Sequence, residues 1–423
     1  KPLGEGSFAS VHKSYHVGSQ KNPTLSDKIF SAKISKPQQN LSDKKFNRLW
    51  KSEAELLAQY QPVNAFTKLN GRYVLISDYL GKKNMAQAIK DGDIADLTFK
   101  DRVDLVTQLL TQLKEMHSNN PNSLPIIHRD IKPENIMFSR SKSASNKTVI
   151  NATLIDFGLA TTISSHQNNG YNPANTNVIY KKSYAGTPHY FAPETVECQT
   201  SFSSDIYSLL SILLWLFGAT APLENKKKYS AIRKKIVGLF TKNKFLILQS
   251  KEPYSFNGLF GRVERPQCLY FVLPLMQQLF FNMQSIKPEK RPKTNELWLF
   301  FFNLSLIAST IDNDELESNS KMILFKKQKK SLINSYNTCI SRIKNSAPMK
   351  VVRIPTQLST SNSKKQAAIK NAAHLKNNKN NPQFPSDRIQ AKIRRFAYYQ
   401  LLNNKNIGKE RKKDLTDIAT ENL

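Results

Sequence analysis

Cysteine is scarce in this sequence of 423 residues, and its three cysteines form no recognisable set. Cys198, Cys268 and Cys339 are odd in number, and none lies in a CxxC pair or at a Cys/His metal-ligand spacing. The pattern supports neither a disulfide framework nor a zinc site. We therefore expect the protein to work in a reducing compartment.

Long apolar runs are also missing. The two longest candidates, residues 206–217 and 297–307, fall short of the roughly 18–20 residues that a membrane-spanning helix needs, and they carry internal Ser or Asn. We interpret both as buried core helices. The chain begins with Lys1, and residues 2–4 already belong to a motif, so we expect an upstream part and draw nothing from the lack of a signal peptide.

Acidic residues are few: 32 Asp and Glu stand against 63 Lys and Arg, for a net charge of +31. Residues 311–423 alone hold 23 Lys and Arg against 9 Asp and Glu, so this end is the more basic. The positive electrostatic field of such a chain favours nucleic acid, anionic lipid or acidic protein as a partner. A solvated Lys- and Asn-rich surface would show the same excess of Lys and Arg. We expect no nucleic acid as the primary partner.

The candidate catalytic residues lie in three short motifs. Residues 128–135 read HRDIKPEN, residues 155–158 read IDFG, and residues 192–194 read APE. Asp130, Asn135 and Asp156 can hold metal or take a proton, and Lys132 supplies a cation beside them. Phosphoryl transfer needs little more than a positioned base, metal ligands for the phosphates and cations for the developing charge.

The order HRDxKxxN, DFG and APE resembles the catalytic and activation segments of the eukaryotic-type (Hanks-type) Ser/Thr protein kinases. The resemblance implies that Asp130 orients and deprotonates the substrate hydroxyl and that Lys132 contacts the γ-phosphate of ATP. It also implies that Asn135 and Asp156 bind Mg²⁺, while His128 is a packed structural histidine. Lys132, two residues after Asp130, is typical of Ser/Thr rather than tyrosine kinases.

The first residues resemble the kinase phosphate loop. Residues 4–11 read GEGSFASV, a Gly-rich turn between two expected strands, although Ala9 stands where a third Gly is usual. Alone, this pattern is equally typical of an ordinary hairpin turn. The resemblance implies a nucleotide-binding set of Gly4, Gly6, Ser7 and Val11.

Residues 29–34 alternate as a strand, which places Lys33 on the same face as Ser31, toward the expected cleft. Lys33 resembles the kinase lysine that holds the α- and β-phosphates. Its carboxylate partner should lie on a helix over residues 46–60, where Glu53 and Glu55 compete. We favour Glu53 because Leu57, one turn later, shares its face and can pack on the lobe core.

Residues 73–81 form an apolar strand that ends in Gly and resembles the interlobe hinge, so the backbone from Asp78 to Leu80 would bond the adenine edge. Residues 99–117 carry apolar side chains at helical spacing and predict a core helix that leads into the catalytic loop. Glu194 should pair with Arg291, and Asp205 should anchor the catalytic-loop backbone; both roles are implied by the resemblance.

The activation segment should run from residue 159 to residue 192. Thr187 lies in a GTPxY sequence, where the resemblance implies that its hydroxyl bonds Asp130 and Lys132. The candidate phosphoacceptors of the segment are Ser164, Ser165, Thr176, Ser183 and Thr187. Ser183 lies four residues before Thr187, at the spacing where the resemblance implies the phosphoacceptor, and a phosphate there could order the segment through Arg129.

We predict an α+β, bilobal protein-kinase-like fold over residues 1–310, with a small antiparallel sheet lobe (1–80) and a larger helical lobe (81–310). An insertion is expected near residues 224–265. Residues 311–423 should form a basic tail, helical near 319–345 and 387–403 and disordered over 355–385. The second tail helix is basic and amphipathic, so it would face calmodulin, an anionic lipid or its own catalytic domain.

The sequence thus predicts an ATP- and Mg²⁺-dependent protein Ser/Thr kinase that acts on protein substrates. The alternative is a pseudokinase scaffold that binds nucleotide or protein without catalysis. We expect a cytoplasmic location, which would be the host cytosol if the chain is a eukaryotic-like effector kinase of an intracellular bacterium.

Overall fold

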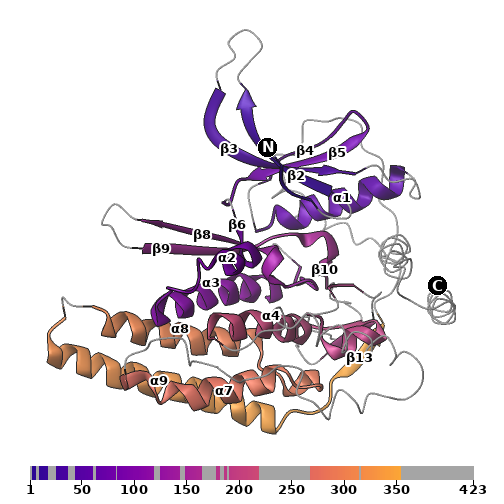
Figure 1. Ribbon diagram of the computed structural model, residues 1–423. Coiled ribbons are helices and arrows are strands. Elements are labelled where there is room, and N and C mark those ends of the chain that lie inside the picture. The colour runs from indigo at the N-terminus through magenta and orange to yellow at the C-terminus, as the bar shows by residue number, and fades with distance from the viewer. Residues whose placement is uncertain are drawn as a thin grey trace.

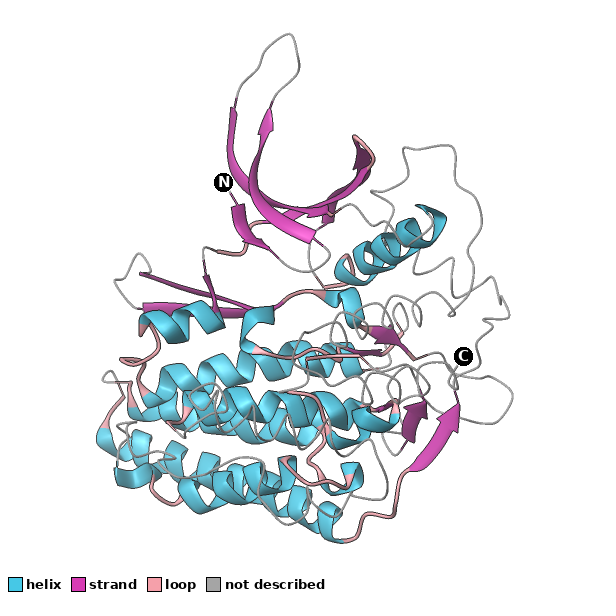
Figure 2. Ribbon diagram, turned by 45° about the vertical axis from the view of Figure 1, so that its right-hand side comes forward, coloured by secondary structure: helices cyan, strands magenta, loops and turns pink. Residues whose placement is uncertain are grey.

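The computed structural model describes thirteen stretches of the chain: residues 2–5, 9–17, 25–36, 43–60, 63–81, 83–118, 124–142, 148–163, 178–181, 185–187, 190–218, 267–313 and 316–353. Within them the chain forms two lobes (Figure 1). A curved sheet and one helix make the smaller lobe, and a stack of helices makes the larger one (Figure 2). The predicted bilobal α+β fold is confirmed.

The smaller lobe is an antiparallel sheet with strand order β1-β2-β3-β5-β4. Its strands are β1 (Pro2–Glu5), β2 (Ala9–Val17), β3 (Leu25–Ser35), β4 (Val63–Leu69) and β5 (Arg72–Asp78). The central strand β3 places Lys33 opposite Val11 of β2 and Leu75 of β5. Because β3 is bonded on both edges, the position of Lys33 is fixed by two ladders.

Helix α1 (Asp43–Leu57) is the one helix described in this lobe. Phe46, Trp50, Ala54 and Leu57 are buried and recur every three to four residues, so they form the face that packs on the sheet. The helix both starts and ends about three residues earlier than predicted. The amide of Tyr60 bonds the carbonyl of Leu57, three residues back, so the chain tightens into a turn after the helix.

The larger lobe contains the other helices that the structure describes: α2 (Met85–Asp91), α3 (Phe99–His117), α4 (Phe202–Leu216), α7 (Val272–Met283), α8 (Thr294–Ile311) and α9 (Ser318–Lys344). The 3₁₀ turns described there are η1 (Pro133–Asn135), η2 (Phe157–Leu159), η3 (Pro193–Glu197), η5 (Gln267–Leu269) and η6 (Pro288–Lys290). The catalytic motifs therefore fall on turns and loops that this helical body supports.

Three small sheets accompany the five-stranded one among the described residues. The strands of the first are β6 (Lys83–Asn84), β8 (Ile136–Lys142) and β9 (Thr148–Leu154). The second pairs β7 (Ile126–Ile127) with β10 (Thr161–Thr162). The third has the order β12-β11-β13 and contains β11 (Val178–Lys181), β12 (Gln199–Thr200) and β13 (Lys350–Arg353).

The core of the larger lobe is built around α3, α4 and α8. Thr98 and Asp101 form a capping box that begins α3, and eight of its apolar side chains are buried in the core. The apolar run 206–217 covers most of α4 and its C-cap Phe217, and the run 297–307 lies within α8; every residue of α4 except Trp215 is buried. None of the described helices is long and apolar enough to cross a membrane.

Helix α9 lies along α8 as part of the same body (Figure 1). Leu332, Cys339 and Ile343 on one of its faces are buried in the main core. The first predicted tail helix thus corresponds to an element packed against the larger lobe. The expected insertion at 224–265, the tail stretch 355–385 and the second tail helix at 387–403 lie outside the described residues.

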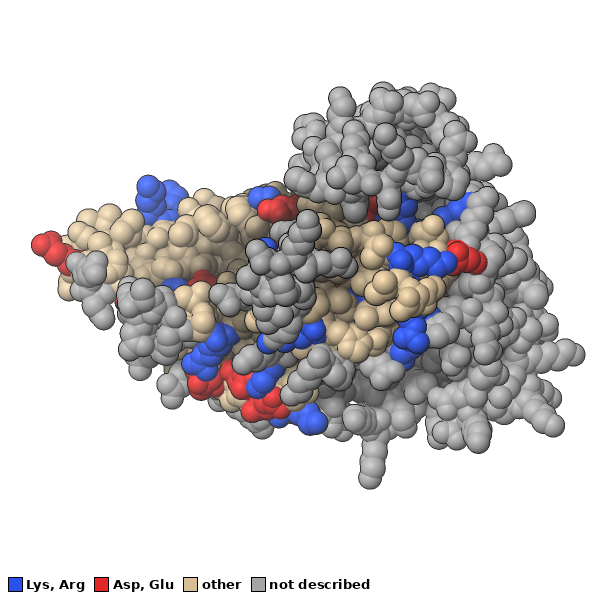
Figure 3. Space-filling view, turned by 90° about the horizontal axis from the view of Figure 1, so that it is seen from above, with Lys and Arg blue, Asp and Glu red and all other residues tan. Residues whose placement is uncertain are grey.

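Seen from the side of the smaller lobe, described Lys and Arg side chains lie interspersed with Asp and Glu (Figure 3). The described part of this face therefore carries both signs of charge, although the chain as a whole has a net charge of +31. Mixed charges of this kind are typical of a solvated surface rather than of a single-sign steering field.

Candidate active site

The catalytic loop follows β7 and is held from below by Asp205 of α4. One oxygen of the Asp205 carboxylate accepts the backbone N–H of His128 (2.8 Å), and the other accepts that of Arg129 (2.9 Å). The ring of His117 also lies 2.9 Å from Asp205. These bonds hold Arg129 in a left-handed conformation (φ 71°), which turns the next residue, Asp130, toward the activation segment.

Asp130 sits at the centre of a bonded cluster. Its Oδ1 accepts the hydroxyl of Thr187 (2.7 Å), and its Oδ2 accepts the amide of Asn135 (3.0 Å) and the ammonium of Lys132 (2.9 Å). Lys132 also donates to the hydroxyl of Thr187 (2.7 Å). A carboxylate held by donors on both oxygens and already accepting one alcohol is suited to accept another, from a substrate.

The second cluster joins the two lobes. Lys33 of β3 contacts Glu53 of α1 directly, and its ammonium lies 3.0 Å from Oδ1 of Asp156. Of the two acids that competed in the sequence, Glu53 is the one at Lys33, whereas Glu55 lies within 4.0 Å of Lys51 on its own helix. The packing of α1 against the sheet therefore brings Glu53 into contact with Lys33, which lies 20 residues earlier in the chain.

These three charges shift one another. Burial alone would lower the pKa of Lys33, but Asp156 and Glu53 together raise it above its usual value. Lys33 lowers the pKa of Asp156 from 3.8 to about 2, with help from the amide of Gly158. Burial raises the pKa of Glu53 despite its contact with Lys33. In such a cluster the ammonium can pair with phosphate oxygens, and the ionised carboxylate can bind a hard metal ion.

Phe157 anchors the loop that carries Asp156. Its ring lies 5.3 Å from the ring of His128 and stacks on Tyr60 at 5.7 Å with an interplanar angle of 3°. His128 thus has packed neighbours, and its Nε2–H donates to Ile155 O (3.2 Å). Tyr60 follows α1 and belongs to no motif, so its part in this stack could not be predicted from the sequence.

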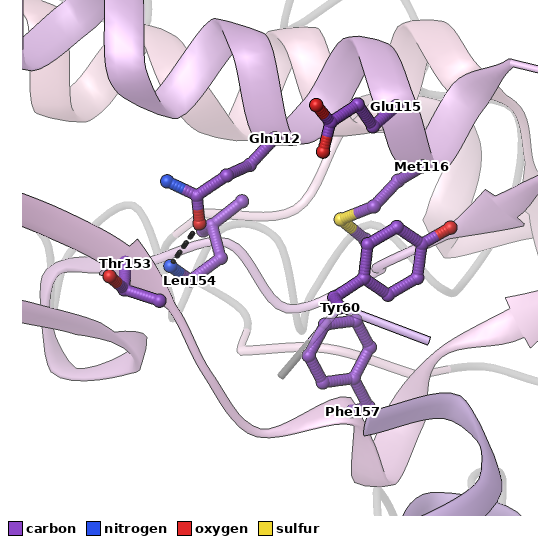
Figure 4. Close-up of a pocket in the computed structure, with 7 residues that line it drawn as sticks. All are labelled: Tyr60, Gln112, Glu115, Met116, Thr153, Leu154 and Phe157. Carbon is purple, nitrogen blue, oxygen red and sulfur yellow. Dashed lines mark hydrogen bonds between the residues drawn. The ribbon is translucent and has the colours of Figure 1, made fainter. Parts of the chain in front are cut away.

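Behind Phe157 lies a cavity of about 240 Å³. Figure 4 shows its lining, which comes from the turn after α1, from α3, from β9 and from η2: Tyr60, Gln112, Glu115, Met116, Thr153, Leu154 and Phe157. The hydroxyl of Tyr60 is buried without a hydrogen-bond partner in the part of the chain that the structure describes. Burial, followed by the charge of Glu115, raises its pKa to about 12.

The nucleotide side of the site is partly described. Gly4 pairs with Val11 across β1 and β2, but Gly6 and Ser7 lie outside the described residues. Ser31 and Ser77 face each other across β3 and β5, and their hydroxyls are 2.9 Å apart. This hydroxyl pair places small polar groups beside the expected adenine edge.

The hinge is fixed by its first residue. Asp78 at the end of β5 accepts the amide of Asn64 (2.9 Å) and lies 3.2 Å from the ammonium of Lys28. Its side chain thus bonds neighbours in the sheet. We therefore expect a ligand to bond the backbone between Asp78 and the half-buried Leu80.

Glu194 and Arg291 form a buried pair in the larger lobe. The two terminal nitrogens of Arg291, Nη1 and Nη2, donate to the carboxylate of Glu194 at 2.7 Å, and Ser204 donates to the same carboxylate at 2.7 Å. Arg291 also donates to Ser203 O and Ser285 O. Ser204, which also caps α4, was missed from the sequence because it lies outside the three motifs.

The described residues contain no group of three or more His, Cys, Asp or Glu that could by itself hold a metal. Two oxygen ligands nevertheless fit Mg²⁺. The Asp156 side chain is 44% exposed and ionised beside Lys33, and Asn135 uses its amide nitrogen on Asp130, which leaves its oxygen end as the ligand. Hard cations that complete their shell with phosphate oxygens and water need few protein ligands.

Comparison with known proteins identifies the family. The protein kinase domain family matches residues 1–299, which is more than half of the chain. The chain belongs to the protein kinase family. The matched region holds the catalytic loop, Lys33, Glu53, Asp156 and the Glu194–Arg291 pair, so the kinase resemblance inferred from the three motifs is confirmed.

Several curated kinases are similar to this one. Calcium-dependent protein kinase 4 of Plasmodium berghei is 28% identical over 249 residues, covering 57% of this chain and 41% of its own length. Serine/threonine-protein kinase D of Synechocystis is 26% identical over 233 residues, covering 53% and 41%. DNA damage response protein kinase DUN1 of Saccharomyces cerevisiae is 29% identical over 215 residues, covering 46% and 37%. The match thus spans less than half the length of each relative.

Proposed function

We propose that this kinase transfers the γ-phosphate of ATP to Ser or Thr hydroxyls of protein substrates. The observation that carries the proposal is the bonded cluster of Asp130, Thr187 and Lys132, in which a carboxylate already accepts an alcohol beside a cation. The Lys33–Glu53–Asp156 cluster lies on the adjoining wall of the site. Together they provide a base for the acceptor and a cation for the phosphates.

In the proposed reaction, the acceptor hydroxyl binds at Asp130 and gives its proton to that carboxylate. The hydroxyl oxygen forms a bond to the γ-phosphorus as the bond to the β,γ-bridging oxygen breaks, and ADP leaves with that electron pair. Lys132 offsets the charge on the transferred group, and Lys33 that on the remaining phosphates. Mg²⁺ held by Asp156 and Asn135 would add the charge neutralisation that phosphoryl transfer needs.

The two charge clusters also bear on the alternative, a pseudokinase scaffold. A chain that only binds nucleotide has no use for a carboxylate positioned at an alcohol. Asp130 makes its contacts within the catalytic loop and the activation segment, whereas Lys33 and Asp156 reach toward the nucleotide side. A substitution of Asp130 should therefore affect phosphoryl transfer and leave nucleotide binding intact.

The test is ATP-dependent phosphorylation of a mixed peptide set by wild type and by Asp130→Asn. We expect the variant to bind ATP like wild type but to lose roughly 10²–10⁴-fold in turnover, the usual contribution of a general base. Glu134→Gln in the same loop is a matched control, because Glu134 is exposed and should leave turnover unchanged. ATP binding by wild type without phosphoryl transfer would favour the scaffold. A phosphoproteomic comparison of cells carrying wild type or Asp130→Asn would then find the substrates.

Three finer proposals accompany this function. The first is that Ser183 is the phosphoacceptor of the activation segment. The second is that the basic helix near 387–403 binds calmodulin or anionic lipid. Ser183 and this helix lie outside the described residues. Mass spectrometry of active protein together with Ser183→Ala tests the first, and tryptic protection of Arg394 and Arg395 by calmodulin and Ca²⁺ tests the second. A cytoplasmic location is the third.

A further inference from the structure

Strand β13 (Lys350–Arg353) lies well beyond the residues matched by the kinase family, yet it pairs with the activation segment. It runs parallel to β11, and each of the four residues of β11 has a partner in it. Strand β12 pairs with the other edge of β11, but only at Tyr180 and Lys181. Among the described strands, β13 is therefore the sheet partner of Val178 and Ile179. A two-residue ladder is marginal alone, and β13 makes β11 a central strand.

Strand β11 is connected to the catalytic loop. Tyr180 is buried in a cluster of its own with Ile127, Ile163 and Phe202, separate from the main core. Ile127 immediately precedes the HRD sequence. Six residues after β11 comes Thr187, which bonds Asp130 and Lys132. A cluster of four side chains is too small to hold a strand by itself, so the hydrogen bonds of β13 contribute to its position.

The chain reaches β13 from a fixed point. At the end of α9, Lys290 of the turn η6 donates to Ile343 O (2.9 Å) and Lys344 O (3.1 Å). Arg342 donates to Glu296 and to Arg291 O (2.8 Å). Helix α9 is therefore tied to the same turn whose Arg291 pairs with Glu194, at the end of the activation segment.

We propose that β13 is a positioning strand, which holds β11 so that Thr187 and the substrate-facing end of the activation segment stay against Asp130. This role rests on the proposed kinase function and adds a regulatory element to it. Strand β13 lies on the side of the larger lobe, away from the five-stranded sheet (Figures 1 and 2). It supports the bonded form of the Asp130 cluster, so its loss should weaken binding of the peptide substrate and leave binding of ATP unchanged.

The first experiment tests the pairing without any assay of activity. Ile179 and Val351 are register partners, so Ile179→Cys with Val351→Cys in the full chain should form a disulfide on oxidation, detected in tryptic peptides. Ile179→Cys with Arg353→Cys is the matched control, because two further residues along a strand add about 6.6 Å and exceed disulfide reach. Equal crosslinking of both pairs, or of neither, would overturn the register. Loss of turnover on crosslinking would show an inhibitory strand and overturn the supporting role.

The second experiment tests the role. In an edge strand, one of two successive backbone N–H groups faces the partner strand and the other faces away, so Val351→Pro and Val352→Pro should differ. One of them should raise the peptide KM and lower kcat/KM for peptide roughly tenfold, since ladder bonds to β11 are lost, with an unchanged ATP KM. Hydrogen exchange over residues 178–181 should speed up in the same variant.

The outcomes separate the two proposals. An active wild type whose two proline variants keep the wild-type peptide KM would overturn the role of β13 alone. A wild type that forms the 179–351 disulfide but transfers no phosphate would overturn the proposed kinase function, on which this role depends. A proline variant that is more active than wild type would show that the strand restrains the enzyme, contrary to the proposal.

Discussion

Two clusters of charge in this kinase use the same kinds of side chain for different ends. In the cleft, Lys33, Glu53 and Asp156 keep 23%, 11% and 44% of their side-chain surface exposed. In the larger lobe, Arg291 and Glu194 keep 0% and 6%. The cleft cation contacts two carboxylates and keeps part of its surface exposed, whereas the buried pair makes further hydrogen bonds with Ser204, Ser203 O and Ser285 O.

This difference in exposure distinguishes charges that stabilise the fold from charges that are available to a ligand. A buried charge must be fully paired, because removing its partner leaves an uncompensated ion in a low dielectric. A charge that faces a cleft keeps solvent as an alternative and can exchange it for a ligand. Substitutions in the cleft cluster should therefore lower turnover with little effect on the free energy of unfolding. Substitutions in the buried pair should chiefly lower the free energy of unfolding.

The largest expected effect is on turnover at the cleft. Asp156→Ala removes the carboxylate that would hold Mg²⁺, and we expect turnover to fall by roughly a thousandfold or more. The free energy of unfolding should change by less than about 1 kcal/mol, since the side chain is substantially exposed. Kinetics over a Mg²⁺ titration and urea unfolding check the two parts. Retained turnover with an ordinary Mg²⁺ dependence would rule out Asp156 as the metal ligand.

The next effect is on stability at the buried pair. Arg291→Met leaves Glu194 as an unpaired buried charge and should cost about 3–5 kcal/mol of unfolding free energy. Arg140→Met is the matched control, because Arg140 pairs with Asp96 at the surface and its loss should cost less than about 1 kcal/mol. Urea unfolding of both variants makes the comparison. Equal costs would mean that burial does not distinguish the two classes of pair.

A third effect extends the comparison to helix α9, whose Cys339 is buried against Glu296 of α8. Burial, followed by the charge of Glu296, raises the pKa of the Cys339 thiol, so it should stay protonated and covered at neutral pH. Cys268 is exposed. A thiol reagent should modify Cys268 rapidly and Cys339 only on unfolding, as followed by mass spectrometry. Leu332→Ala, which should cost about 2–5 kcal/mol in the same interface, should speed up modification of Cys339. Rapid modification of Cys339 in the native wild type would contradict the packing of α9.

The smallest effect concerns pH. Lys33 lowers the pKa of Asp156 from 3.8 to about 2, so ionised Asp156 contributes stability above pH 3.8 that is lost as pH falls toward 2. Asp156→Asn lacks this contribution and retains the Lys33–Glu53 contact. The stability difference between wild type and variant should therefore be constant near neutral pH and shrink between pH 4 and 2. Thermal unfolding over that range measures it, and a difference that grew on acidification would have the wrong sign.

Much of the architecture could be predicted from the sequence because its signals are local. The α3 periodicity is bounded by a capping box at Thr98, and the apolar runs 206–217 and 297–307 supply core side chains, although Leu299, Phe302 and Leu306 of the second run are exposed. The HRD, DFG and APE sequences follow in a fixed order that identifies the family. Where local signals were weak, as at the end of α1, the predicted boundary was wrong by about three residues.

The sequence by itself determined the family, the catalytic residue types and the long helices, since each depends on residues near one another in the chain. Only the tertiary structure decided which acid meets Lys33, because Glu53 and Glu55 differ by a rotation about one helix axis. It likewise decided the stack of Tyr60 on Phe157 and the pairing of β13 with β11. Strand pairing depends on which edge is left open in the folded chain, and a four-residue strand carries no local record of the edge it will meet.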